Sequence, residues 1–306
     1  MAKRTRKRKR KTRRKKVKSK KRYKKRTKKA KIINCAPKKK KVLSYTCYTP
    51  KNLLKLKKLW NMKHPGMKIK TNKPYDIWTN LRDNMDNVCG RENCWLNQQF
   101  VKENVSSKMF KDTFRPYSPK KWKRKPDEWL TSIDVINVMK QYESYDKRFE
   151  FIGPSPIDYN THTYGGECVW EELCKFNLSD NIKKKKTKVG IIFNLDKHDQ
   201  PGSHWVAVFL DIKKNKIYYF DSYGDKTPGR IMKFIRDIQS QGLELRRKIK
   251  FSENKTRHQY SNSECGMYCI HFIIRMVKGD SFEKHQKKQI SDNKMKRLRK
   301  IYFNQT

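Results

Sequence analysis

The spacing of hydrophobic residues predicts short helices in the first part of the chain. Leucines recur at helical intervals over residues 52–60, and this helix is expected to end at the His-Pro-Gly of residues 64–66. Residues 77–81 and 94–101 show similar patterns and predict further short helices. The first part of the chain is therefore expected to form a small helical subdomain.

The pattern changes near the middle of the chain. Prolines punctuate residues 114–126, which is typical of a connector. A helix is predicted over residues 129–139, where Thr131 and Asp134 stand at the spacing of a capping box. The Gly-Pro-Ser-Pro sequence at residues 153–156 predicts another break.

The second half contains short apolar runs of strand length. Residues 189–195 form one such run, and residues 205–210 and 217–220 form two more, separated by the polar residues 213–216. Two short apolar runs joined by a short polar segment are typical of an antiparallel hairpin.

Helical periodicity returns between and after these runs. Residues 169–173 predict a short helix, the lysines at 183–186 predict a solvated loop, and residues 231–238 predict a helix with Phe234 and Ile238 inward. A more apolar helix is predicted over residues 265–277. The fold class expected from these elements is α+β, with the last helix packed on a sheet that contains the hairpin.

Charge divides the chain further. Residues 1–41 hold 26 Lys and Arg and no acidic residue, and the whole chain of 306 residues carries a formal net charge of +49. Such a segment repels itself and has little to bury, so it is expected to be disordered. The sequence predicts a disordered polybasic arm at 1–41, a helical accessory subdomain at 42–125 and an α+β domain at 126–306.

Two classes of protein are excluded by the same patterns. No stretch approaches the about 18 consecutive apolar residues of a membrane span, and the N-terminus is charged where a secretory signal is apolar. We therefore expect no membrane partner and no export by the usual route. The eight cysteines are expected to be free thiols in a reducing compartment.

Cys265 is the candidate nucleophile, because it follows a polar stretch and begins the apolar helix, where unpaired N–H groups favour a thiolate. His271 lies six residues further along that helix, about 240° round, and points away. His258 lies in the loop before this helix, and a position close to Cys265 remains open for it. His204 stands at the start of a predicted strand, a rigid mount for a general base.

The predicted hairpin supplies a third group. It brings Asp221 back to the same end as His204, where a carboxylate can hold the imidazole and stabilise its protonated form. Gln259, six residues before Cys265, can donate to a developing oxyanion beside the Cys265 backbone N–H. These four residues form the predicted catalytic set. A structural thiol at Cys265 and a plain hairpin-closing role for Asp221 remain the alternatives.

Three motifs carry a family resemblance. Residues 203–208 (SHWVAV), 219–224 (YFDSYG) and 259–268 (QYSNSECGMY) resemble those of cysteine proteases of the adenovirus-endopeptidase and SUMO-protease type. The resemblance covers residues 126–306 and implies a papain-like, adenain-like core. In that core the helix with the cysteine packs on a mixed sheet that carries the histidine and aspartate.

The resemblance also implies a substrate tunnel. Residues 129–133 (WLTSI) resemble the WLND-type helix start of the family, with Thr-Ser in place of Asn-Asp. Trp129 and Trp205 would then flank a narrow passage for a Gly-Gly-like segment, since two indole faces leave no room for a Cβ. Ordinary core packing is the alternative for both rings. The Gly-Gly at residues 165–166 resembles a cleavage site but is expected to be a plain turn.

The first half narrows the resemblance to core-protein maturation proteases of nucleocytoplasmic large DNA viruses: poxvirus, African swine fever virus and mimivirus-like enzymes. This implies an endopeptidase that cuts viral structural or core precursors after small residues, in the virion and in the host cytoplasm (viral factory) during assembly. The segments that carry it are residues 53–61, 77–81, 94–95, 113–116 and 153–158.

Two other functions remain open: an isopeptidase that removes SUMO or another ubiquitin-like modifier, and a DNA-packaging protein whose protease fold is inert. The cysteines show no C-x₂-C spacing, so no metal and no organic cofactor are expected. The basic arm and the remaining excess of +23 on residues 42–306 predict nonspecific binding of nucleic acid. The resemblance adds nucleic acid as a candidate activator.

Overall fold

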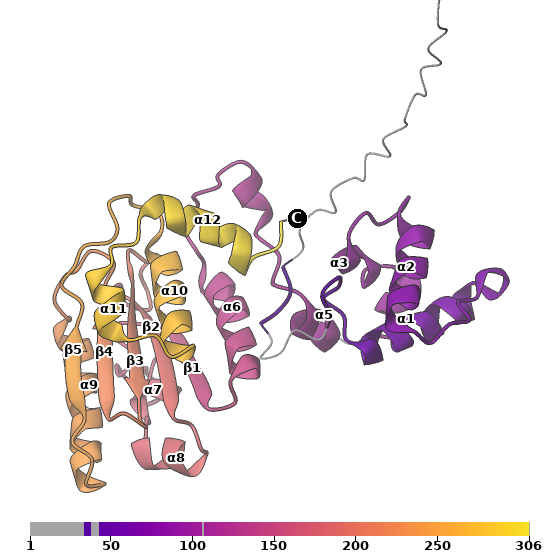
Figure 1. Cartoon of the computed structure of the whole chain (residues 1–306). Coiled ribbons are helices and arrows are strands. Elements are labelled where there is room, and N and C mark those ends of the chain that lie inside the picture. The colour runs from indigo at the N-terminus through magenta and orange to yellow at the C-terminus, as the bar shows by residue number, and fades with distance from the viewer. Residues whose placement is uncertain (1–33, 38–42, 106, 306) are drawn as a thin grey trace, which may run out of the picture. The chain divides into compact units, whose positions relative to one another are not determined.

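The structure is a computed structural model that describes residues 34–37, 43–105 and 107–305 (Figure 1). The described residues belong to one compact unit. Most of the predicted basic arm lies outside them. Its described part, residues 34–37, pairs with the folded chain, since Ala36 N–H donates to Thr113 O at 2.9 Å. The predicted division at residues 41/42 and 125/126 stays a prediction.

In the described part of the chain, five strands form one mixed sheet in the order β1-β2-β3-β4-β5. The two outer pairs, β1 with β2 and β4 with β5, are parallel, and the inner pairs are antiparallel. The strands are β1 (Phe149–Pro156), β2 (Lys188–Asn194), β3 (Trp205–Asp211), β4 (Lys216–Phe220) and β5 (Lys250–Glu253).

Both faces of this sheet are covered. Helices α6 (Ser132–Tyr145) and α10 (Cys265–Val277) pack on one face, and α9 (Gly229–Glu244) packs on the other (Figure 1). Successive residues of β3 belong alternately to the two apolar clusters, because side chains of a strand point to opposite faces. This burial on both faces explains why β3 is a continuous apolar run rather than an alternating one.

Helix α10 is buried almost completely. Every residue from Cys265 to Val277 except Arg275 is buried, as expected for a helix that is apolar on all sides. Gly266 permits the close approach of Leu130, because a Cβ at this glycine would stand 3.1 Å from the Leu130 side chain. The first turn of α10 is therefore packed against the segment that precedes α6.

The residues before the sheet form a separate apolar cluster between Cys47 and Phe114. Their helices are α1 (Pro50–Lys63), α2 (Pro74–Met85), α3 (Glu92–Trp95), α4 (Gln99–Lys102) and α5 (Ser107–Thr113), with 3₁₀ turns η1 (Pro65–Met67) and η2 (Lys120–Lys123). The remaining helices are α7 (Glu171–Cys174), α8 (Leu178–Lys183), α11 (Phe282–Lys287) and α12 (Asp292–Tyr302). Among the described residues, no helix is both long and apolar enough to cross a bilayer.

Most of the predicted elements are confirmed. Helices cover residues 52–60, 77–81, 231–238 and 265–277, and the hairpin is β3 and β4. The capping box is also present, because the Asp134 N–H donates to Thr131 Oγ1 at 3.3 Å and the Thr131 N–H donates to Asp134 Oδ2 at 2.9 Å. Residues 94–101 instead span the end of α3 and the start of α4.

The predicted break at residues 153–156 is wrong, because these residues belong to β1. β1 pairs on one side only, with β2, so an unpaired proline nitrogen costs no ladder bond on its open side. The register also shifts between Ile152 and Ser155, which accommodates the Gly-Pro pair as a local irregularity.

The expectation of eight free thiols is wrong for six of them. Cys265 and Cys269 are free, and the others form the disulfides Cys35–Cys47, Cys89–Cys94 and Cys168–Cys174. Two of these pairs are five and six residues apart across a turn, and the third joins segments that meet through tertiary contacts. Sequence spacing alone does not reveal that proximity.

Candidate active site

The β3–β4 hairpin brings His204 and Asp221 into contact. His204 directly precedes β3 and Asp221 directly follows β4, and His204 Nε2 lies 2.7 Å from Asp221 Oδ1. The carboxylate is 1% exposed and also accepts a hydrogen bond from the Tyr223 N–H at 2.9 Å. The Asn254 side chain donates to Asp221 O at 2.7 Å, which fixes the backbone that carries this carboxylate.

Cys265 reaches this pair from the opposite layer. It is the first residue of α10 and is 3% exposed, and it lies close enough to His204 for its hydrogen bond and charge to raise the pKa of that ring. Because Asp221 engages Nε2, the nitrogen left for the thiol is Nδ1. The structure thus brings together the three predicted residues from two strand ends and one helix start.

Burial lowers the pKa of His204, but its hydrogen bonds to Asp221 and Cys265 and the charges of those two groups outweigh burial and raise this pKa to about 9. The ring is therefore protonated at neutral pH. A positive ring held between a carboxylate and a sulfur can exchange a proton with that sulfur and later deliver it to a leaving group.

Tyr223 contributes to this arrangement, although sequence reasoning did not single it out. Its ring stacks on the His204 ring with centroids 4.7 Å apart and planes 15° apart. The Arg257 guanidinium lies over the Tyr223 ring, 5.3 Å from its centroid. Tyr223 stood within the YFDSYG motif, but a stacking partner cannot be distinguished there from any other aromatic.

Gln259 lies beside the Asp221 loop. Its side chain is fully buried, accepts from Ser222 Oγ at 2.7 Å, and donates to Ser261 O at 2.6 Å. A primary amide has two N–H groups, and the second of Gln259 donates to Tyr223 Oη at 3.4 Å. The predicted role of Gln259 at an oxyanion stays a prediction.

The two predicted tunnel residues differ in burial. Trp205 is 7% exposed, belongs to the core cluster, and donates from Nε1 to Leu130 O at 3.3 Å. Trp129 is 43% exposed and directly precedes Leu130, which packs on Gly266 at the start of α10. The indoles therefore flank the same short segment, one inside and one at the surface. Their role in substrate binding stays a prediction.

The other thiol and histidines near α10 have structural contacts. Cys269 is fully buried, and its Sγ donates to Trp205 O at 3.1 Å. Burial first, and then the charges of Cys265 and Asp221, raise the pKa of Cys269 well above its usual value. His271 contacts Tyr302 Oη at 2.7 Å, which confirms that its ring faces away from Cys265. His258 Nδ1 instead accepts from a backbone N–H at 3.1 Å.

A buried ion pair ties α12 to the start of α10. Arg299 Nε lies 2.9 Å from an oxygen of Glu264, the residue just before Cys265, and Arg299 also donates to Glu128 O at 2.7 Å. Burial raises the pKa of Glu264, and the charge of Arg299 opposes that effect. Removing one partner of such a pair typically costs about 3–5 kcal/mol, so Arg299 supports the backbone at the nucleophile.

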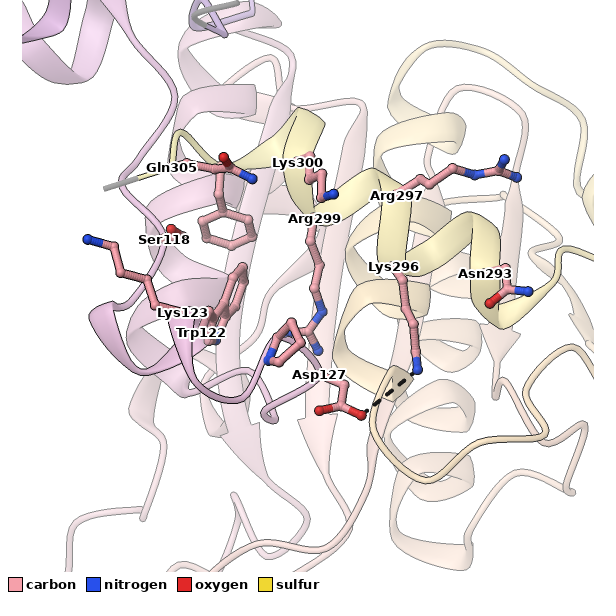
Figure 2. Close-up of a pocket in the computed structure, with 12 residues that line it drawn as sticks. Ser118, Trp122, Lys123, Asp127, Asn293, Lys296, Arg297, Arg299, Lys300 and Gln305 are labelled. Atoms are coloured by element: carbon pink, nitrogen blue, oxygen red, sulfur yellow. Dashed lines mark ion pairs between the residues drawn. The ribbon is translucent and has the colours of Figure 1, made fainter. Parts of the chain in front are cut away.

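Arg299 also borders a cavity of about 780 Å³ between η2 and α12 (Figure 2). The rings of Trp122 and Phe303, 4.9 Å apart, form its apolar part. None of the four predicted catalytic residues lines it. Figure 2 shows the basic side chains at its edge, which are Lys123, Lys296, Arg297 and Lys300.

Comparisons with known proteins show the family of this chain. Residues 134–306 match the Ulp1 protease family, C-terminal catalytic domain. A protein of Acanthamoeba polyphaga mimivirus whose name describes a thiol protease is 30% identical over 298 residues, 88% of this chain and 92% of that protein. A cysteine protease of African swine fever virus is 30% identical over 231 residues, 70% of this chain and 83% of that protein.

The fold is also that of a solved viral protease. The crystal structure of an African swine fever virus protease superposes with a TM-score of 0.66 at 19% identity and covers 89% of this chain and 96% of that one. These matches confirm the predicted family resemblance and the predicted α+β fold. The chain belongs to the Ulp1 protease family and is a cysteine protease.

Proposed function

We propose that this cysteine protease is an endopeptidase that cleaves viral structural or core precursors after small, Gly-Gly-like residues during virion maturation. The observation that carries the proposal is the contact of His204 with both Asp221 and Cys265. Support for the viral setting comes from relatives in two viruses, whose similarity extends over most of the chain and not only over its catalytic half. The proposed locations are the virion and the viral factory.

The chemistry follows from the three side chains. Transfer of the Cys265 thiol proton to His204 forms the protonated ring and the nucleophilic sulfur, and Asp221 keeps the ring in the orientation that allows it. The sulfur then attacks the carbonyl carbon of a substrate glycine, and the Cys265 N–H and the Gln259 amide stabilise the oxyanion. His204 protonates the departing amine, and water, deprotonated by the same ring, hydrolyses the thioester. No step requires a metal or an organic cofactor.

The preference for glycine is proposed to come from Trp129 and Trp205. The exposed indole of Trp129 is available to a substrate, and the buried indole of Trp205 holds Leu130 in place through its N–H. A substrate strand that passes close to aromatic faces has little room for a Cβ.

Nucleic acid is a second proposed partner, together with the precursor proteins. Support comes from the 26 Lys and Arg of residues 1–41 and from the basic edge of the α12 cavity (Figure 2). Phosphate contacts made by lysines and arginines carry no sequence information, so the binding is proposed to be nonspecific. Nucleic acid is also the candidate activator.

Replacing the nucleophile tests the proposed reaction. The Cys265→Ala variant is expected to lose at least about 10⁴-fold in cleavage rate, because no other group can form the thioester. The measurement is incubation of purified wild-type and variant protein with virion core precursors, read by electrophoresis and mass spectrometry of the fragments. Cleavage that persists in the alanine variant would refute the mechanism.

The same preparation separates two substrate classes. Efficient cleavage of short Gly-Gly peptides supports precursor maturation, because such peptides offer no folded surface to recognise. Cleavage only of fusions to a ubiquitin-like modifier would instead show a deconjugating isopeptidase.

Alkylation tests whether Cys265 is chemically active. Iodoacetamide is expected to modify Cys265 about a hundredfold faster than Cys269, because the pKa of Cys269 is raised and its sulfur donates to Trp205 O. Peptide mapping of the native, reduced protein over time gives both rates. Equal rates would indicate an inert protease fold, as in a DNA-packaging protein.

The pH dependence tests the charge of His204. The protonated ring is needed for the leaving group, so kcat/KM is expected to fall as pH rises through about 9. Asp221→Asn removes a charge and a hydrogen bond that raise this pKa. The fall of kcat/KM at alkaline pH should therefore move to lower pH, and kcat should decrease. A peptide assay from about pH 5 to about pH 11 gives both curves. If kcat/KM falls at the same alkaline pH in the variant, the fall does not report the protonation of His204 and the proposal is contradicted.

Salt dependence tests the proposed binding of nucleic acid. The affinity for duplex DNA is expected to fall steeply with salt and to be independent of sequence, because bound counterions are released. A variant that lacks residues 2–31 should bind about a hundredfold more weakly in low salt and show a shallower salt slope. Unchanged affinity and slope in that variant would show that the arm does not bind nucleic acid.

A further inference from the structure

A tight turn after β1 places a histidine beside a cysteine. His162 and Cys168 form an isolated antiparallel bridge, and His162 Nε2 lies 3.7 Å from Cys168 Sγ. The Gly166 N–H donates to Thr163 O at 2.9 Å, and Gly166 has φ +77°, a value that favours glycine. The Gly-Gly pair of residues 165–166 thus forms the predicted turn and closes the loop that joins these two residues.

A second cysteine completes the cluster. Cys174 ends α7, and one ligand atom each of His162, Cys168 and Cys174 lies within 4.8 Å of the others. Among the residues that the structure describes, this is the one such group of three His, Cys, Asp or Glu side chains. Cys168 is buried and His162 is exposed, so the cluster lies at the surface and can be reached by an ion from solution.

The working conditions of the enzyme affect this cluster. A cysteine protease needs its nucleophile as a free thiol, and low-molecular-weight thiols keep such a thiol reduced. Two such thiols would reduce the Cys168–Cys174 disulfide, supplying two electrons and two protons and forming a disulfide of their own. The loop would then present two thiols and one imidazole on the same short stretch of chain.

We propose that His162, Cys168 and Cys174, in the reduced protein, form a binding site for Zn²⁺. Two thiolates and one imidazole nitrogen are the soft donors that zinc prefers, and a water completes four ligands. Binding releases the two thiol protons. Zinc–ligand bonds of about 2.0–2.3 Å require donor atoms about 3.3–3.8 Å apart, which small side-chain movements of this cluster can reach.

The site would stabilise a segment that supports the active site. Asp158, in the same segment between β1 and β2, accepts from the His198 N–H at 3.0 Å and contacts the His198 ring at 2.8 Å. His198 belongs to the loop that leads to His204. A metal at residues 162–174 would therefore hold one anchor of the loop that positions the general base. The inference does not depend on the identity of the substrate.

Metal titration of the reduced protein tests this site. The Cys265→Ala form is used, because it removes the other cysteine–histidine pair. We expect one equivalent of Zn²⁺ to bind, Co²⁺ to give the absorption of a tetrahedral thiolate complex, and zinc to protect Cys168 and Cys174 from alkylation. Cys168→Ser and Cys174→Ser should abolish binding, and His162→Asn should weaken it at least about tenfold. Cys89→Ser, from a cysteine pair outside the cluster, is the matched control and should change nothing.

Three outcomes would overturn the proposal: no binding to the reduced protein, equal binding to the oxidised protein, or binding that persists in the Cys168→Ser variant. Circular dichroism shows whether each variant is folded. If a serine variant fails to fold, His162→Asn decides the question, because His162 is exposed and its replacement leaves the core intact.

Discussion

The hydrogen bond between His204 and Asp221 is the interaction on which the proposed chemistry depends. It exists because β3 and β4 form a tight antiparallel pair whose open ends carry the two residues. Burial alone would lower the pKa of His204, and the nearby carboxylate and sulfur reverse that effect. The His204 ring, which would otherwise be neutral, therefore carries the proton that the leaving amine needs. The sheet fixes the position of this ring.

The rest of the catalytic half holds Cys265 against this ring. Helix α10 is buried on nearly all sides, so its first residue has little freedom to move away. The buried pair of Glu264 and Arg299 joins that helix start to α12, which also borders the basic cavity. A ligand that contacts Arg299 in this cavity would thus touch the same side chain that supports the nucleophile. This connection is a physical route by which the proposed nucleic-acid ligand would influence the proposed reaction.

The sequence predicted what depends on local pattern and missed what depends on tertiary contact. The hairpin, the last helix and the order of His204, Asp221 and Cys265 follow from periodicity and motif spacing, and the structure brings these residues together. β1 was missed because prolines obscure an edge strand, and β5 is too short to show a pattern. Tyr223 and the disulfide partners depend on which segments meet in space, which no spacing encodes. The cluster at His162 was missed for the same reason, because its histidine joins the cysteines only across a turn.

The central claim is that His204 is held protonated at neutral pH by Asp221 and Cys265. Nitrogen NMR of the His204 ring across a pH titration measures this protonation directly, in the resting enzyme and without substrate. The account predicts a ring that loses its proton near pH 9, and at lower pH once Asp221 is replaced by asparagine. A ring that is already neutral at pH 7 and unaffected by that replacement would contradict it.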